Sequence, residues 1–387
     1  MDFTLTSEQQ MIQDTARQFA AAELEPLAAS FDRGENPTAF TGNLRKLAEL
    51  GFMGLAIDAD YGGAEAGSIA FSLAITELAR GCASTAVTVS VTNMVAEVIQ
   101  AVGNAAQKQQ FLPRLCSGEY PAGSFCLTEA DAGSDPAAMK TTAVCEGDHY
   151  RLNGSKMFIT SAAYAGVFVV WAVTDPSARK GKGISCFLVD RDTPGLRIGK
   201  AEEKMGQKAS TTNTVHFEDC LVPISGLLGA PEQGFRIAVG ELAGGRIGIG
   251  SLALGLGGAA LDYARHYLTE RRQFGQPLAE FQGLQWMLAD HYTDMEAARL
   301  LLLNAAALKE GGLPFAKQAS MAKLFASEKA NRACYAALQM LGGYGYIKEY
   351  PLERLARDAR ITTIYEGTSE VQRIIIARQL LSEINYP

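Results

Sequence analysis

The sequence predicts an α+β protein with an N-terminal α-helical domain, a middle β domain and a C-terminal helical bundle. Three observations predict this order. Apolar residues recur at helical spacing to about residue 117, β-rich runs fill the stretch to about residue 228, and long helical patterns return after it. We therefore expect domains at residues 1–117, 118–228 and 229–387.

The first helix is expected to start at Ser7, because Ser7 followed by Gln10 can form a capping box. Five apolar residues then recur at helical spacing: Met11, Ile12, Ala16, Phe19 and Ala20. The same kind of pattern continues through the first 117 residues, so this whole zone is expected to be helical.

The middle zone contains five runs rich in β-branched and aromatic residues, at 150–152, 156–160, 167–174, 184–189 and 214–217. Asn153-Gly154 separates the first two runs and is typical of a two-residue hairpin turn. We therefore expect a hairpin at this dipeptide.

The C-terminal zone contains long helical patterns at residues 281–308, 315–340 and 366–384, which indicate a bundle. Two glycine-rich stretches, at residues 244–245 and 255–258, are compatible with a dinucleotide-binding fold. No strand precedes them and no βαβ unit surrounds them, so small residues for close helix packing are the better account.

Composition is that of an ordinary globular protein, with 48% hydrophobic and 20% charged residues in 387. A formal net charge of −7 argues against a nucleic-acid partner. The N-terminus lacks the basic stretch and apolar run of a secretory signal, and the longest apolar run, at 167–173, is too short to cross a bilayer. We expect a soluble, cytoplasmic protein that does not associate with membranes.

The seven cysteines are scattered, odd in number and without a Cys-x-x-Cys pair, so reduced and mostly buried thiols are expected in place of a disulfide framework or a zinc site. The four histidines are equally dispersed. We therefore expect no metal centre.

Residues 364–370, Ile-Tyr-Glu-Gly-Thr-Ser-Glu, place the carboxylate of Glu366 beside a glycine at the start of a helical pattern. This is a suitable seat for a catalytic base. A glutamate in the first turn of a helix is also favoured by the helix dipole and by capping, so the segment alone does not decide between these roles.

Further segments bear on this choice. They are Cys-Leu-Thr-Glu-Ala-Asp-Ala-Gly-Ser-Asp at 126–135, Arg-Arg-Gln-Phe-Gly at 271–275 and Gln-Met-Leu-Gly-Gly-Tyr-Gly-Tyr at 339–346, followed by Glu349, Arg354 and Asp358. In order, spacing and chain length the sequence resembles the acyl-CoA dehydrogenase family over nearly its whole length. The resemblance implies the same three domains, with a four-helix bundle as the third.

The resemblance implies α,β-dehydrogenation of an acyl-CoA thioester, in which Glu366 removes the α-proton and the β-hydrogen leaves as hydride to FAD. The main-chain N–H of the glutamate and a flavin hydroxyl would stabilise the enolate, and Gly367 would allow the close approach. Desolvation by the acyl chain should raise the pKa of Glu366. Some relatives place their base just before the arginine that corresponds to Arg246, where this chain has Gly245.

The resemblance also implies a set of FAD contacts, and part of that set would be shared between neighbouring chains of a homotetramer. The residues are Phe125, Leu127, Thr128, Ser134, Phe158, Ile159, Thr160, Arg271, Phe274, Gln282, Gln339, Gly342, Gly343, Thr368 and Glu370. Several of them have a plainer alternative. Arg271 is equally compatible with a solvated helix end and the two glycines with a helix C-cap, while residues 125–134 and 158 would also suit a turn and a strand core.

The substrate site implied by the resemblance includes Ser134, Arg246, Tyr365 and Gly367, with an acyl pocket along Thr88, Val89, Thr92, Val95 and Ala96. Core packing is the alternative for this last stretch. Glutaryl-specific relatives carry an arginine near the position of Ser84, so a neutral short or medium acyl chain, straight or modestly branched, is expected.

Two features concern the CoA arm. Many relatives have Asp at the position of Ala243, where it bonds pantetheine, so altered anchoring is expected. Lys180 and Lys182 are candidate partners for CoA phosphates, although exposed lysines are usually only solvated.

The leading hypothesis is an FAD-dependent dehydrogenase that passes electrons to electron-transfer flavoprotein. An oxygen-using, acyl-CoA oxidase-like flavoenzyme of the same fold and a catalytically silent CoA-thioester binding protein are the alternatives. Oxidase relatives are commonly much longer, and Glu366 together with the flavin segments argues against a silent protein.

Overall fold

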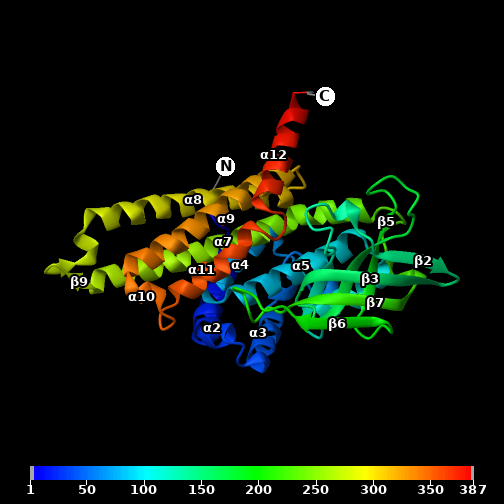
Figure 1. The fold of residues 1–387 in the computed structure, drawn as a ribbon, viewed down its shortest axis with the longest axis horizontal. Helices are drawn as coiled ribbons and strands as arrows, with labels where there is room; N and C mark the ends of the chain where they lie inside the picture. The colour runs from blue at the N-terminus through cyan, green and yellow to red at the C-terminus, as the bar shows by residue number, and fades with distance from the viewer. Residues whose placement is uncertain (1–3, 385–387) are drawn as a thin grey trace.

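The computed structural model describes residues 4–384 and contains a helical region, a β region and a second helical region (Figure 1). The long helices of the C-terminal region extend to one side and the sheet lies at the other (Figure 1). The predicted fold class is confirmed.

The N-terminal region contains six α-helices: α1 Ser7–Phe19, α2 Glu25–Asp32, α3 Pro37–Glu49, α4 Gly67–Gly81, α5 Ala83–Val102 and α6 Ala105–Cys116. The capping box of α1 forms one residue earlier than predicted, because Thr6 accepts from the Gln9 N–H and Gln9 bonds the Thr6 N–H. Met11 is 62% exposed, so its predicted place on the apolar face with Ala16 and Phe19 is wrong.

The middle region forms one twisted sheet with the order β6-β7-β3-β2-β4-β5-β8, and β1 pairs in parallel with β4. Its strands are β1 Ala122–Cys126, β2 Thr142–Glu146, β3 His149–Thr160, β4 Ala165–Val173, β5 Ile184–Asp190, β6 Leu196–Ala201, β7 Thr212–Pro223 and β8 Leu227–Leu228.

The hairpin predicted at Asn153-Gly154 is wrong, because β3 runs through both residues. The register between β3 and β7 shifts here instead, so the dipeptide forms a bulge. Asn153 bonds the N–H of Asp219 on β7 at 2.8 Å, and a Cβ on Gly154 would lie 2.6 Å from Thr141 Oγ1. Glycine is therefore required by a close approach of chains inside the sheet.

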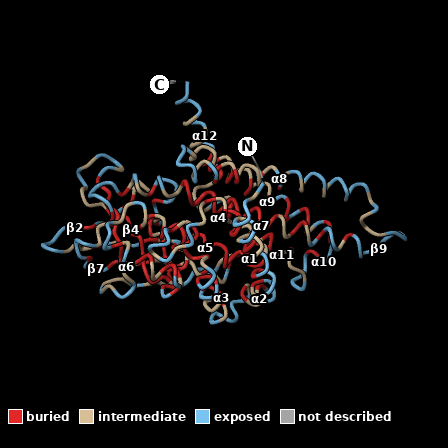
Figure 2. The backbone as a smooth tube through the Cα atoms, turned by 180° about the vertical axis from the view of Figure 1, so that it is seen from behind, coloured by how far each residue is buried: buried red, intermediate tan, exposed pale blue. Residues whose placement is uncertain are grey.

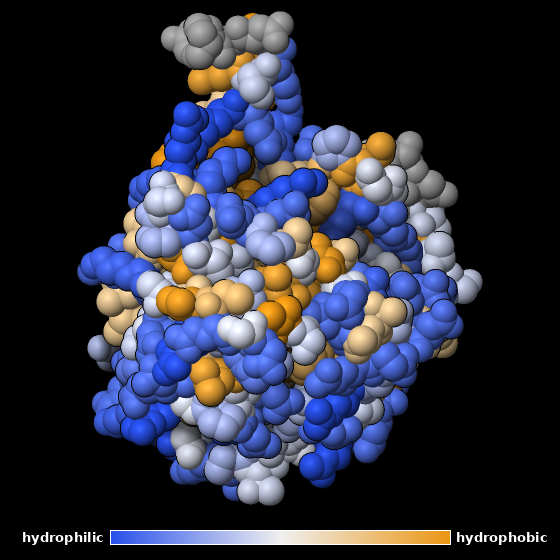
Figure 3. Space-filling view, turned by 90° about the vertical axis from the view of Figure 1, so that its right-hand side faces the viewer, coloured by the Kyte–Doolittle hydropathy of each residue, from blue (hydrophilic) through white to orange (hydrophobic). Residues whose placement is uncertain are grey.

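The C-terminal region is built on three long helices, α7 Gly234–Glu270, α8 Gln282–Glu310 and α9 Ala316–Leu341. A short hairpin of β9 Arg272–Gln273 and β10 Gln276–Pro277 joins α7 to α8. The chain ends with α10 Gly343–Tyr346, α11 Leu352–Arg360 and α12 Ser369–Glu383, and α12 projects from the body (Figures 1 and 3).

Burial is concentrated where the three regions meet, and the outer half of α8 and the end of α12 are exposed (Figure 2). Two helices among the described residues, α5 and α7, are long and apolar enough to cross a membrane, and most of each is buried between neighbouring elements. All seven cysteines are free and six are buried, as predicted.

The glycines of α7 allow neighbouring elements to approach its backbone. A Cβ on Gly255 would lie 2.2 Å from the Thr76 carbonyl oxygen of α4, and one on Gly257 would lie 2.7 Å from Met295 Sδ of α8. The prediction that these glycines serve helix packing is confirmed, since they lie well inside α7 and face α4 and α8. This close packing brings α4, α5 and α7 together beside the site described below.

Gly255→Ala should lower the free energy of unfolding by about 1–3 kcal/mol, because the backbone oxygen that the methyl group meets cannot turn away. Gly240→Ala on the same helix is the control. A Cβ there meets nothing within 4 Å, so this change should stabilise the helix by up to about 1 kcal/mol. Chemical denaturation of both variants with cofactor bound tests the difference, and equal stabilities would contradict the packing account.

Candidate active site

Glu366 and Gly367 form a tight loop between a short 3₁₀ turn, Ile361–Thr363, and α12. Both have left-handed backbones, with φ of 54° and 87°. Glu366 was expected to begin the last helix, but α12 starts three residues later, where Thr368 caps it by accepting from the N–H of Val371 at 3.3 Å. The left-handed pair turns the chain, so Glu366 faces inward from a loop.

The carboxylate of Glu366 lies against α7 at a position without a side chain. A Cβ on Gly245 would lie 3.1 Å from Glu366 Oε2 and 2.8 Å from Met94 Sδ. Oε2 is buried and accepts no hydrogen bond from any described residue. The two base positions considered from the sequence, 245 and 366, therefore lie at the same place in the structure, and only Glu366 can occupy it here.

Burial raises the pKa of Glu366, and the positive charges of Arg246 and Lys323 oppose that rise. Both cations are buried: Arg246 is 6% exposed and Lys323 is 0% exposed. Arg246 Nη1 bonds Ser320 Oγ at 3.4 Å, whereas its Nε has no partner among the described residues. The pKa of Glu366 is thus raised as predicted, by the protein interior itself before any acyl chain contributes.

A second ionisable cluster lies beside the base and was not found from the sequence. Lys309 pairs with Glu97, and a Cβ on Gly244 would lie 3.0 Å from Lys309 Nζ. Burial, Glu97 and Glu366 raise the pKa of Glu241 well above its ordinary value, against the effect of Lys309. Glu97 and Lys309 are 212 residues apart in the chain, so no local spacing could have indicated the pair.

The predicted wall of the acyl pocket on α5 is fully buried: Thr88, Val89, Thr92, Val95 and Ala96 are each 0% exposed. The hydroxyls of the two threonines already have partners. Thr88 Oγ1 lies 3.1 Å from Ser210 Oγ, and Thr92 Oγ1 accepts from the Gly123 N–H at 3.3 Å. Both therefore help dock α5 onto the β region, whatever else they contact.

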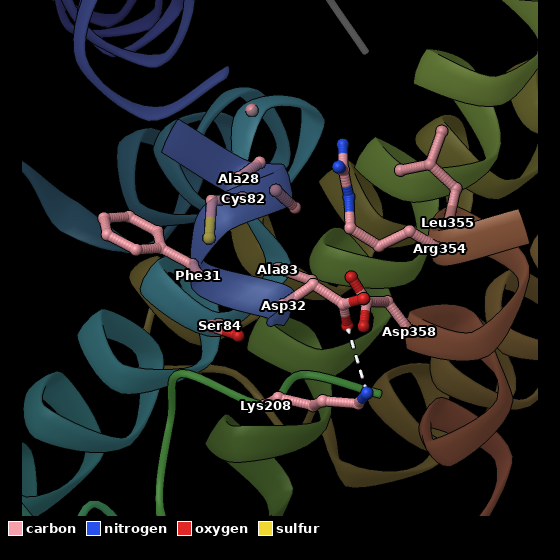
Figure 4. A pocket seen from close by; sticks show the side chains of 12 residues that line it. Ala28, Phe31, Asp32, Cys82, Ala83, Ser84, Lys208, Arg354, Leu355 and Asp358 are labelled. Atoms are coloured by element: carbon pink, nitrogen blue, oxygen red, sulfur yellow. Dashed lines mark ion pairs between the residues drawn. The ribbon is translucent and has the colours of Figure 1, made fainter. Parts of the chain in front are cut away.

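Two cations lie near Ser84, where the sequence indicated none. The same small cavity is lined by Lys208 and Arg354, together with Asp32 and Asp358 (Figure 4). Lys208 Nζ lies 3.9 Å from an Asp32 oxygen, so the positive charges there are matched by carboxylates. With a volume of about 10 Å³, the cavity holds at most about one water molecule.

Two of the predicted flavin-facing segments are joined to each other. The N–H of Met157 on β3 donates to the Thr128 carbonyl at 2.8 Å, and the buried Lys156 bonds the Leu127 carbonyl at 3.2 Å and Glu129 Oε1 at 2.7 Å. The loop after β1 and the end of β3 are therefore fixed as one surface.

At that surface Phe158 is 58% exposed with a left-handed φ of 58°. A large ring held outward in this conformation fits the predicted contact with a flat cofactor, and Thr160 lies half-buried two residues on. Ile159 is 1% exposed and belongs to the core. The ring of Phe125 packs on Trp171 with centroids 4.2 Å apart, so Phe125 supports the sheet.

The predicted contacts with the other end of FAD meet at the outer end of the bundle. Arg271, Gln339, Gly342 and Gly343 line one cavity of about 450 Å³. Arg271 is exposed and lies over the ring of Tyr344 at 5.4 Å, without an ion pair to any described carboxylate. An unpaired guanidinium beside the backbone of two glycines fits the diphosphate of a dinucleotide.

Phe274 and Gln282 do not line this cavity. Phe274 is 93% exposed at the tip of the β9–β10 hairpin, and Gln282 is exposed at the first residue of α8. Ser134 and Glu370 are exposed as well, and Glu370 follows the cap of α12. The single chain thus brings together only part of the predicted cofactor set.

Three further predicted features can be located. Tyr365 is held by a hydrogen bond of 3.1 Å from Gln207 Nε2 to its hydroxyl. Ala243 is buried on α7 and offers no polar group. Lys180 pairs with Asp135, which makes it a partly neutralised partner for a phosphate.

Three family models match the chain: the acyl-CoA dehydrogenase N-terminal domain at residues 6–119, the middle domain at 124–220 and the C-terminal domain at 232–381.

Two curated relatives illustrate the similarity. The chain is 45% identical to the short-chain specific acyl-CoA dehydrogenase of Clostridium acetobutylicum, over 98% of this chain and 100% of that protein. It is 46% identical to the acryloyl-CoA reductase (NADH) of Anaerotignum propionicum, over 98% and 96%.

Three solved structures are similar in fold. Butyryl-CoA dehydrogenase from Megasphaera elsdenii matches with a TM-score of 0.95 and 41% identity, over 98% of this chain and 100% of that chain. A chain in a structure described as the electron transferring flavoprotein of Acidaminococcus fermentans matches with 0.95 and 44%, over 98% and 100%. Acyl-CoA dehydrogenase complexed with FAD from Bacillus anthracis matches with 0.93 and 32%, over 98% and 68%.

Arg271→Ala should weaken FAD binding on the order of 10- to 100-fold, the equivalent of one charge-assisted hydrogen bond of about 1.5–3 kcal/mol. Arg272→Ala is the control, since Arg272 is exposed next to it and its guanidinium donates to the Gly275 carbonyl at 3.2 Å, outside the cavity. FAD affinity and melting temperature should fall together in the first variant, because bound cofactor stabilises only the folded state. Equal FAD retention by both variants would remove Arg271 from the cofactor site.

Proposed function

The chain belongs to the acyl-CoA dehydrogenase family of FAD-dependent oxidoreductases, and we propose that it dehydrogenates short acyl-CoA thioesters to trans-2-enoyl-CoA with Glu366 as the base. The observation that carries the proposal is the unpartnered Oε2 of Glu366, buried in the space that Gly245 leaves open.

The geometry suits removal of a weakly acidic proton. Burial makes Glu366 a stronger base than an exposed carboxylate, while Arg246 and Lys323 keep its ionised form accessible. The main-chain N–H of Glu366 donates to no other described residue, so it is free to donate to a thioester carbonyl on which negative charge develops.

The reaction balances as removal of one proton and one hydride. Glu366 takes the proton from Cα, the hydride leaves Cβ, and the two electrons of the Cα–H bond form the new double bond. Bound FAD supplies the acceptor for the hydride. This chain would hold it by Leu127, Thr128, Phe158 and Thr160 at one end and by Arg271 at the other.

The direction of the reaction and the electron acceptor are further parts of the proposal. The similar chain in the Acidaminococcus fermentans flavoprotein structure supports electron-transfer flavoprotein as the partner. The relative named acryloyl-CoA reductase supports a second candidate, the same chemistry run toward the saturated thioester. An oxygen-using enzyme of the same fold stays an alternative, and oxygen reactivity of the reduced protein separates it.

We also propose a homotetramer in the cytoplasm. Large apolar side chains are exposed on the outer bundle and on α12, as expected of surfaces that other subunits cover: Phe274, Trp286, Tyr335, Tyr346, Ile374, Leu380, Leu381 and Ile384. The free, mostly buried cysteines suit a reducing compartment. A monomer in solution with one FAD per chain would contradict the shared cofactor site.

Glu366→Gln should retain FAD and lower the rate of dehydrogenation by on the order of 10² to 10⁴-fold, since it removes the base and nearly keeps the shape. Glu296→Gln, at a surface glutamate paired with Arg299, is the control and should react like the parent protein. The measurement is the loss of flavin absorbance after mixing with butyryl-CoA. Rapid loss of flavin absorbance in Glu366→Gln would show that Glu366 is not the base.

A panel of acyl-CoA substrates tests the acyl preference. We expect kcat/KM to be highest among butyryl-, isobutyryl- and hexanoyl-CoA, lower for octanoyl-CoA and lowest for glutaryl-CoA. The distal carboxylate of glutaryl-CoA would be buried without a cation to offset its desolvation, because the cavity that Lys208 and Arg354 line near Ser84 is too small to admit it and Lys208 already pairs with Asp32. A preference for glutaryl-CoA would show that a cation does reach the pocket.

A further inference from the structure

The backbone that carries the base lies in a conformation that glutamate rarely adopts. Glu366 and Gly367 are consecutive left-handed residues, with φ of 54° and 87°. A glycine tolerates this at no cost, whereas a residue with a Cβ keeps it only where the surroundings hold it in place. The structure must therefore contain groups that hold this loop.

Two buried donors meet the loop, one from α9 and one from α12. Lys323 Nζ, from the middle of α9, donates to the Gly367 carbonyl at 2.8 Å. Gln372 Nε2, from the first turn of α12, donates to the same carbonyl at 2.8 Å and to the Glu366 carbonyl at 3.1 Å. Lys323 and Gln372 are each 0% exposed, so water does not compete for these bonds.

Burial of the Lys323 amino group lowers the stability of the fold, so packing alone does not explain a lysine at this position. Lys323 forms no ion pair with a described carboxylate within 4.0 Å, and burial lowers its pKa to about 8. The charged groups that act on it are Glu366 in the loop, Arg246 on α7 and Glu370 on α12. An apolar side chain of equal length would fill the same space without this penalty, so what the amino group adds is a hydrogen bond and a charge.

We propose that Lys323 and Gln372 are positioning residues, which clamp the carbonyls of residues 366 and 367 and so hold the left-handed turn that directs the Glu366 carboxylate. The inference rests on the proposed function, in which Glu366 is the base. Both residues supply a hydrogen-bond donor to the loop. They differ in charge, because only Lys323 adds a positive charge that favours the ionised carboxylate of Glu366.

Four variants separate these contributions. Lys323→Met removes donor and charge, Lys323→Gln keeps a donor and removes the charge, and Gln372→Met removes only a neutral donor. Lys329→Met is the control, because Lys329 lies on the same helix and pairs with Asp294 at 2.9 Å, away from the loop.

The measurement is the limiting rate of flavin reduction by saturating butyryl-CoA between pH 5 and 10, together with substrate affinity and FAD content. Lys323→Met and Gln372→Met should each lower the limiting rate at least about tenfold and change substrate affinity less than about threefold. Both lysine variants should move the midpoint of the pH–rate curve upward, since loss of a nearby positive charge raises the pKa of Glu366. Gln372→Met should leave that midpoint in place.

A parent-like limiting rate in Gln372→Met would overturn the proposal, as would an unmoved midpoint in Lys323→Gln. If Lys323→Met loses its cofactor on purification, Gln372→Met and Lys323→Gln still test the proposal. The clamp alone would be rejected if butyryl-CoA reduces the flavin of the parent protein but not of Glu366→Gln, while Gln372→Met and the two Lys323 variants behave like the parent. The proposed function would then still stand. A parent protein that no acyl-CoA reduces would reject the function itself.

Discussion

The close approach of other elements to helix α7, at positions where it has glycine, is the constraint on which the site depends. At Gly245 the base and Met94 occupy the space of a missing side chain, and at Gly244 the Lys309–Glu97 pair does the same. Farther along, Gly255 admits the backbone of α4. Each glycine costs helix stability, roughly 1 kcal/mol relative to alanine. Packing against neighbouring elements offsets this, and the result is a carboxylate that lies against a helix backbone with one oxygen buried in the interior.

Charge in that interior is distributed so that no carboxylate is fully compensated. Glu366 is near Arg246 and Lys323, neither of which pairs with it within 4.0 Å. Glu241 shares Lys309 with Glu97 and has one oxygen without a partner among the described residues. Such arrangements are costly for stability but keep a carboxylate reactive, since a strong ion pair would hold its proton affinity too low for a base. The site therefore combines a closely packed backbone with carboxylates whose charges nearby cations neutralise only in part.

Much of this could be predicted from the sequence, and the failures have physical causes. Periodicity indicated the three regions, and motif resemblance located Glu366. The sequence could not show that Glu366 precedes its helix, because the residues that form the left-handed turn also fit the start of the helical pattern. Asn153-Gly154 suits a bulge as well as a turn, and only the partner strand decides. Lys323, Gln372 and the Glu241 cluster were missed because a buried lysine or glutamine looks like a surface one until the fold is known, and most of their partners are distant in sequence.

The most direct test of a base held in this way follows proton removal apart from electron transfer. Acetyl-CoA has α-hydrogens and no β-carbon, so it can lose a proton to Glu366 but cannot reduce the flavin. Incubation with the FAD-loaded protein in D₂O, followed by NMR, measures exchange of those hydrogens. We predict exchange that rises with pH through a midpoint above the ordinary glutamate pKa of about 4.3 and is absent in Glu366→Gln. Equal exchange in both proteins would contradict the account, because some other group would then be the base.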